Sequence, residues 1–145
     1  MTETTKITDF KALVAFRGRI AFLPFGRAAL ALTWLYHGLW LKLLGGSSHQ
    51  AAVIAAAPGL GGTAGYLVLL VLGVVETALA VWVITGYRPR LAAAFQTVLL
   101  LAMNAGGLLW GRLHIADPAG MVIQNLVFLA LVWSAAETQR QTRVV

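Results

Sequence analysis

The stretch LTWLYHGLWLKLL, Leu32 to Leu44, is apolar enough to lie in a lipid bilayer, yet it contains His37 and Lys42. An ionisable side chain inside the hydrocarbon core of a membrane is costly and tends to mark a functional site. A lysine near the membrane surface has a simpler explanation, because its alkyl stem can lie in lipid while its ammonium group reaches water. The rest of the chain helps to decide between these interpretations.

The composition of the whole chain is that of a membrane protein. Of its 145 residues, 59% are hydrophobic and only 11% are charged, against about 25% charged residues in typical soluble domains. Such a chain has too little polar surface to cover a water-soluble globule. The absence of cysteine excludes disulfides, thiolate metal sites and dithiol redox relays. The net charge of +6 does not indicate a nucleic-acid partner, because the basic residues lie at the ends of apolar segments.

Four apolar segments have about the 20 residues that a helix needs to cross a bilayer. The expected spans are 25–44, 64–85, 91–110 and 119–136. With the N-terminus inside, nine lysines and arginines lie on the cytoplasmic face, and only Lys42 and Arg112 lie on the other. Since cytoplasmic loops carry the excess of basic residues, we expect an all-α, four-helix transmembrane bundle with both termini cytoplasmic.

Three further segments lie outside these spans. Residues 1–24 mix basic and aromatic residues, which predicts a cytoplasmic segment lying on the membrane surface. Residues 137–145 form a polar cytoplasmic tail. On the outer side, SSHQAAVIAAAPG predicts a short helix over the mouth of the bundle, with Ser47 and Gln50 at capping-box spacing. Gly107 and Gly111 have the GxxxG spacing that favours close helix packing.

Glu76 is the most informative polar residue, because it falls near the middle of the second span. A carboxylate there costs about 3 kcal/mol on insertion scales, and the chain has only five acidic residues. Gly73 and Thr77 surround it with little bulk, which predicts free space beside its carboxyl group. A protonated, hydrogen-bonded glutamate is the alternative, but the position favours a functional role.

Other polar side chains are expected at a common depth. Counting about 1.5 Å per residue, three of them lie about 9–10 Å below the outer boundary: His37, Asn104 and Asn125. Lys42 lies within about 3 Å of that boundary on the same count. The four spans would then line a pocket that opens to the outer side. Two alternatives remain open: Lys42 extends to water, and each asparagine only bonds to a neighbouring helix. Gln96 is expected to be solvated near the inner interface.

Few cofactors fit this set of residues. Haem is not expected, because His37 has no histidine partner within a span. A metal site needs several His, Asp or Glu ligands at helical spacing, and one Glu and one His are too few. An apolar slot with a carboxyl, an imidazole and amides fits a small hydrophobic molecule instead, such as a quinone headgroup or a lipid.

Several motifs together resemble the DoxX-like family of small bacterial membrane proteins. They are WLYHGLWLKLL followed by His49, then LGVVETAL, FQTVLLL and DPAGMVIQN, and the likeness runs from Arg27 to Ala136. It implies that the family's conserved positions correspond here to Trp34, Gly38, Lys42, His49, Glu76 and Asn125. Better-known relatives are associated with membrane redox systems, including quinone-linked ones, and many members have no assigned activity.

The leading hypothesis is an accessory membrane subunit, not an enzyme by itself, that binds a quinone-like or other small hydrophobic molecule. Its ligand-binding residues would be Glu76, Lys42, His49, His37, Asn125, Asn104 and Trp34. The alternatives are a structural or assembly subunit of a membrane complex or homo-oligomer, without ligand, and a small transporter. The sequence names no ligand and no partner beyond the bilayer.

Overall fold

The structure, a computed structural model, describes residues 24–46 and 48–143. It is 85% helical, without strands in the described part of the chain. Among the described helices, three are long and apolar enough to cross a membrane: α3 (Thr63–Thr85), α4 (Pro89–Leu109) and α5 (Pro118–Arg143). These lie where the second, third and fourth spans are expected. All but the last residue of the expected surface segment 1–24 lies outside the described residues.

The first expected span is helical over residues 24–43, but it changes its winding on the way. Residues 24–35 are α-helical, and η1 (Tyr36–Leu43) continues them as a π-helix. Beyond its end, the Leu44 amide donates to the Leu39 carbonyl, five residues earlier, at 2.9 Å. A π-helix of this length is unusual, because π-turns mostly occur as single bulges, often at functional sites.

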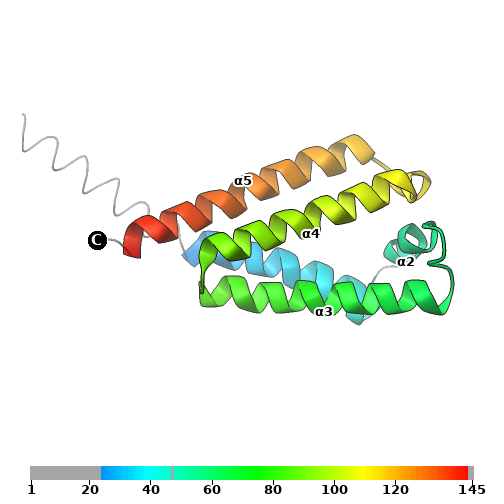
Figure 1. Ribbon diagram of the computed structural model, residues 1–145, viewed down its shortest axis with the longest axis horizontal. Coiled ribbons are helices and arrows are strands. Elements are labelled where there is room, and N and C mark those ends of the chain that lie inside the picture. Colours follow the sequence, from blue (N-terminus) through cyan, green and yellow to red (C-terminus); the bar gives the residue numbers. More distant parts are fainter. Residues whose placement is uncertain (1–23, 47, 144–145) are drawn as a thin grey trace, which may run out of the picture.

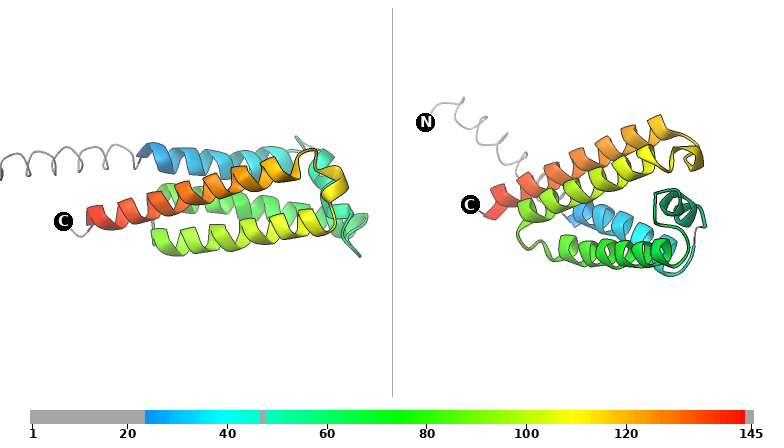
Figure 2. Two further views of the ribbon diagram at one scale, coloured as in Figure 1. Left: turned by 90° about the horizontal axis from the view of Figure 1, so that it is seen from above. Right: turned by 45° about the vertical axis from the view of Figure 1, so that its right-hand side comes forward.

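The long helices are arranged as two pairs (Figure 1). Residues 24–43 pack along α3, and α4 packs along α5. The turn between α3 and α4 joins the pairs at one end: Gly86 ends α3 with φ 65°, and Pro89 begins α4. Glycine favours this left-handed position, and proline fits the first helical turn. From this turn the two pairs diverge, and both ends of the described chain lie at the joined end (Figures 1 and 2).

The short helix α2 (Ser48–Ala55) lies between the diverging pairs at the open end (Figure 2). It contacts α3, α4 and the 3₁₀ turn η2 (Arg112–His114). A Cβ atom added to Gly111 would lie 2.6 Å from Val53 Cγ1, so Val53 sits directly on this glycine. Gly107 and Gly111, the glycines with GxxxG spacing, thus pack against α2, a short helix of the same chain. Packing against another long helix is not needed to explain their spacing.

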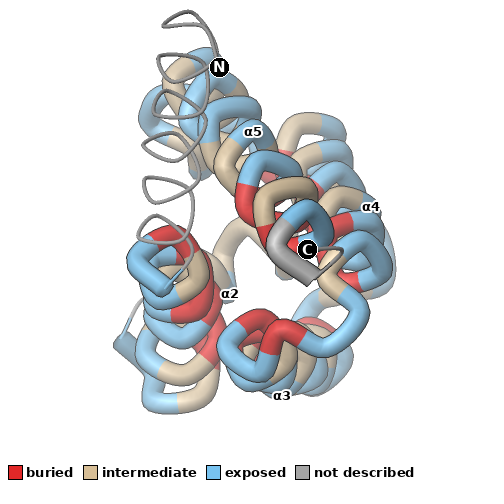
Figure 3. The backbone as a smooth tube through the Cα atoms, turned by 90° about the vertical axis from the view of Figure 1, so that its left-hand side faces the viewer, coloured by how far each residue is buried: buried red, intermediate tan, exposed pale blue. Residues whose placement is uncertain are grey.

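The core lies where the helices face one another, as a view along the helices shows (Figure 3). Its residues include Leu30, Trp34, Leu79, Ala93 and Val132. Trp34 also meets Phe128 edge to face, with ring centroids 5.7 Å apart, and this contact ties the first helix to α5. Large apolar side chains on the outward faces of α3, α4 and α5, such as Val71, Val98 and Val127, are exposed. An apolar exterior of this kind suits contact with lipid.

Candidate functional site

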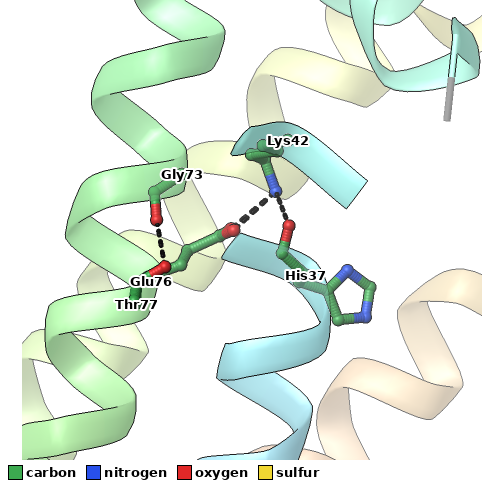
Figure 4. Close-up of polar contacts among 5 residues, drawn as sticks. All are labelled: His37, Lys42, Gly73, Glu76 and Thr77. Atoms are coloured by element: carbon green, nitrogen blue, oxygen red, sulfur yellow. Dashed lines mark hydrogen bonds and ion pairs between the residues drawn. The ribbon is translucent and has the colours of Figure 1, made fainter. Parts of the chain in front are cut away.

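Lys42 and Glu76 form a buried ion pair between η1 and α3 (Figure 4). The Lys42 ammonium group donates to both carboxylate oxygens of Glu76, at 2.6 and 2.8 Å, and more weakly to the His37 carbonyl at 3.5 Å. Lys42 is 7% exposed and Glu76 is fully buried. Lys42 therefore points into the protein. The alternative interpretation, in which its ammonium group extends to water, was wrong.

Two glycines let the helices approach closely enough for this pair. A Cβ atom on Gly38 would lie 2.7 Å from the Gly73 carbonyl oxygen and 2.8 Å from Glu76 Cβ. A Cβ atom on Gly73 would lie 2.8 Å from a methyl carbon of Leu43. All three distances are shorter than real Cβ contacts allow. The first helix therefore occupies the space that the small residues around Glu76 leave. The free space expected beside the carboxyl group is filled.

The pair also depends on where the first helix ends. Lys42 lies against Gly73, which is ten residues, or about 15 Å, from the start of α3. The chain then leaves η1 and forms α2, which contacts α3. Lys42 is consequently level with the middle of α3 and not with its N-terminal end. Lys42 was expected close to the membrane boundary on the assumption that all four helices end at the same level. The first helix ends earlier than the others, so that assumption was wrong.

Asn104 and Asn125 bring α4 and α5 together on the other side of the bundle. The Asn125 side-chain amide donates to the Asn104 side-chain oxygen at 2.7 Å, and both residues are partly buried. Asn104 and Asn125 therefore lie at the same level of the bundle, and each asparagine bonds to a neighbouring helix. No hydrogen bond between the described residues connects this pair to Lys42 or Glu76, so the two asparagines and the ion pair form separate polar contacts.

Trp34 makes a link that the sequence did not reveal. Its indole N–H donates to the Gln96 side-chain oxygen at 2.7 Å, and the Gln96 amide donates in turn to the Ala92 carbonyl at 3.1 Å. Gln96 is 2% exposed, so the expectation that it is solvated was wrong. Gln96 was expected to be solvated because it lies in the first turns of its own helix. Its partner Trp34 lies on a different helix, and this contact depends on how the helices pack.

The two remaining histidines of the expected set lie elsewhere. His37 is exposed, and its imidazole points away from Lys42 and Glu76 (Figure 4). Only its backbone carbonyl takes part in the site. His49 is exposed on α2. A role of these histidines in ligand binding stays a prediction. The described residues contain no group of three His, Cys, Asp or Glu side chains that could hold a metal ion.

A signal for the two glycines was available in the sequence. Gly38 precedes Lys42 by four residues, and Gly73 precedes Glu76 by three. At these spacings each glycine lies on the same helix face as its charged residue. A small residue beside each of two opposite charges is a pattern that predicts close approach of two helices. What the sequence alone did not reveal was that the two faces meet.

Comparison with known proteins gives one positive finding. The sequence model of the DoxX-like family matches residues 31–133, which is more than half of the chain. The matched region includes Lys42, Glu76, Asn104 and Asn125. No curated protein and no solved structure matches the chain significantly.

Proposed function

The chain belongs to the DoxX-like family, and we propose that it is a membrane protein that binds a small hydrophobic molecule at Lys42 and Glu76. In this proposal residues 24–43 form a fourth crossing beside α3, α4 and α5, and both termini lie in the cytoplasm. The membrane is the bacterial inner membrane, and the protein acts as an accessory subunit of a redox system without being an enzyme by itself.

The buried Lys42–Glu76 pair is the observation that carries the proposal. Taking both charges out of water has a desolvation cost that their attraction does not reliably offset, and apolar replacements are often equally stable. Helix packing alone gives little reason to keep such a pair at mid-membrane. An intramembrane charge pair is better explained by a task that needs charge, such as ligand recognition.

The chemistry of the pair suits a quinone-like headgroup. An ammonium group donates a hydrogen bond to a carbonyl oxygen, and a carboxylate accepts one from a hydroxyl group. A quinone carries carbonyl oxygens that could accept from Lys42, and the corresponding quinol carries hydroxyl groups that could donate to Glu76. The Lys42 side chain keeps 6% of its surface exposed while that of Glu76 has none. A ligand would therefore meet Lys42 first and draw it away from Glu76.

One observation favours the assembly alternative. The Lys42 ammonium group already has three acceptors in the two Glu76 oxygens and the His37 carbonyl. The pair is complete without a ligand and could serve only to hold the first helix against α3. A subunit of this kind would purify with a partner protein and without a stoichiometric small molecule.

The two functions are separated by purification in mild detergent, solvent extraction and mass spectrometry of the extract. The informative variant is Lys42→Met with Glu76→Met, which removes both charges at similar volume. The matched control is Arg90→Gln with Glu137→Gln, which removes the exposed ion pair between α4 and α5. A stoichiometric molecule present in the wild type and in the control, and absent from the Met variant, supports ligand binding. Wild-type protein without any such molecule contradicts it.

A further inference from the structure

A second polar region lies at the joined end of the bundle, away from Lys42 and Glu76. The residues that line a cavity there include Arg27, Gln96, Gln139, Trp82 and Tyr87. Residues from the first helix, α3, α4 and α5 all contribute to it. None of these residues takes part in the proposed site, and no motif or spacing along the chain groups them.

Arg27 is the charged group of this cavity. It is half-buried, and its Nε–H donates to the Val83 carbonyl near the end of α3 at 3.1 Å. A Cβ atom on Gly86 would lie 2.9 Å from the central carbon and from one terminal nitrogen of the guanidinium group. The guanidinium therefore lies flat against the turn. Gly86 must be glycine both for its φ of 65° and for this contact.

The charge of Arg27 is not neutralised by the protein part that the structure describes. The ion pairs there join Lys42 to Glu76 and Arg90 to Glu137, and none involves Arg27. An arginine has five N–H donors, and only the Nε–H of Arg27 has an acceptor among these residues. A half-buried guanidinium with open donors fits a bidentate oxyanion such as a phosphate group.

The surroundings of the cavity fit the headgroup level of a membrane. Trp82 and Tyr87 are the residue types enriched at membrane interfaces, and the Trp82 indole N–H donates to the Tyr87 carbonyl at 2.8 Å. Arg88 lies over the Tyr87 ring, 5.3 Å from its centre. Arg90 and Arg140 are exposed at the same end of the bundle. Basic pockets between helices on the cytoplasmic side of a membrane bind anionic lipid headgroups.

We infer that this cavity binds the phosphate of an anionic phospholipid from the cytoplasmic leaflet, through the guanidinium group of Arg27. The amides of Gln96 and Gln139 line the cavity beside it. The inference rests on the proposed orientation, which places this end in the cytoplasm. It does not depend on any ligand at Lys42 and Glu76, because the two regions share no residue.

The test measures lipid binding to the full chain in detergent, where membrane orientation plays no part. Native mass spectrometry compares phosphatidylglycerol with phosphatidylcholine of the same acyl chains. The variant is Arg27→Gln, and the control is Arg140→Gln, which removes an equal charge from an exposed position at the same end. We expect wild-type protein and Arg140→Gln to prefer phosphatidylglycerol by about tenfold or more, since a hydrogen bond to a charged group contributes at least roughly that factor. Arg27→Gln should lose the preference.

Several results would overturn the inference. One is equal binding of both lipids by the wild type, and another is an equal loss of preference in Arg140→Gln. If inorganic phosphate at matched concentration displaces the lipid and binds as tightly, the site takes free phosphate and not a lipid. If Arg27→Gln does not fold, Arg27→Lys decides: the retained charge should preserve a preference that is reduced but measurable, and an unchanged preference contradicts the guanidinium contact. A failed lipid test leaves the ligand test at Lys42 and Glu76 unaffected.

Discussion

Lys42 and Glu76 depend on each other more than on any other residue of the bundle. Both charged side chains are buried. Among the described residues, each has the other as its only ion-pair partner. Removing one partner leaves the other charge buried and uncompensated, whereas removing both leaves none. The two single substitutions should therefore be worse than their combination, which is an unusual order for three variants of one site.

The first prediction tests this order. Lys42→Met alone and Glu76→Met alone should each lower the stability by about 3–5 kcal/mol, and the double variant should recover most of that loss. The measurement is a double-mutant cycle from thermal or denaturant unfolding in one detergent. The exposed pair Arg90–Glu137, 2.8 Å apart, is the control, and its cycle should give about 1 kcal/mol or less. Additive losses at Lys42 and Glu76 would mean that the two charges do not interact.

The sequence predicted the position of Glu76 along its helix, but it did not predict the level at which Lys42 lies. Glu76 stood out because its depth within a single helix can be counted along the chain. The partner of Glu76 could not be counted in this way, because it depends on the relative heights of two helices. Lys42 appeared to lie at the membrane edge, yet the early end of the first helix brings it level with Gly73. Gln96 was misjudged for the same reason.

At the level of elements, the contact between η1 and α3 is set by Gly38 and Gly73. Alanine is normally a better helix former than glycine by about 1 kcal/mol. Here the methyl group would meet the backbone of the facing helix, which cannot move aside as a side-chain tip can. The gain in helix propensity and the cost of the clash act in opposite directions. The 2.7 Å approach at Gly38 makes the clash the larger effect.

The second prediction is that Gly38→Ala destabilises the protein by about 1–3 kcal/mol, the usual cost of overpacking a close contact. Gly61→Ala is the matched control, because a Cβ atom there would have no neighbour within 4 Å and its φ is not positive. That substitution should be neutral or stabilising by about 0.4–1 kcal/mol. Unfolding in detergent measures both variants. Equal effects at the two glycines would show that η1 and α3 are not in close contact.

The third prediction concerns the seat of α2. Gly111→Ala should displace α2, because the new methyl group would lie 2.6 Å from Val53 Cγ1 and 3.1 Å from the Val53 carbonyl oxygen. Adding Val53→Ala removes the first of these contacts and should restore part of the stability. Limited proteolysis of the segment between the first helix and α3 reports the displacement, and unfolding reports the coupling. Strictly additive losses would place Val53 away from Gly111.

Element types were easier to predict than the details of each element. The lengths of the apolar runs predicted the starts of three helices to within two residues. The π-helical winding of Tyr36–Leu43 left no pattern in the sequence, since Gly38 and Lys42 share a face in either kind of helix. α5 also continues to Arg143, beyond the end expected for its span, because its polar last turns remain helical without being apolar.

At the scale of the molecule, the described residues form two helix pairs joined at one end and separated by α2 at the other (Figure 1). Each pair carries its own polar contact: Lys42 with Glu76 in the first, and Asn104 with Asn125 in the second. Sequence patterns predicted that Glu76, Asn104 and Asn125 lie within the spans, and they left open whether Lys42 faces a pocket or extends to water. They could not predict this pairing, because hydropathy fixes which segments are buried but not which helices are neighbours.

The fourth prediction follows from the number of crossings. If residues 24–43 cross the membrane together with α3, α4 and α5, Pro24 and Arg140 lie on one side and His114 lies on the other. With only the three crossings of α3, α4 and α5, Pro24 and His114 would share a side and Arg140 would be opposite. All three residues are exposed. Because the chain contains no cysteine, each single cysteine variant reports on one position without background.

The measurement is labelling of Pro24→Cys, His114→Cys and Arg140→Cys in spheroplasts with a membrane-impermeant maleimide, before and after permeabilisation. We expect His114→Cys to react in intact spheroplasts, and the other two only after permeabilisation, because the excess of lysine and arginine keeps that face in the cytoplasm. Labelling of Pro24→Cys together with His114→Cys would remove the first helix from the set of crossings. The Lys42–Glu76 pair would then join a helix that does not cross the membrane to one that does, and a ligand site between two spans would lose its basis.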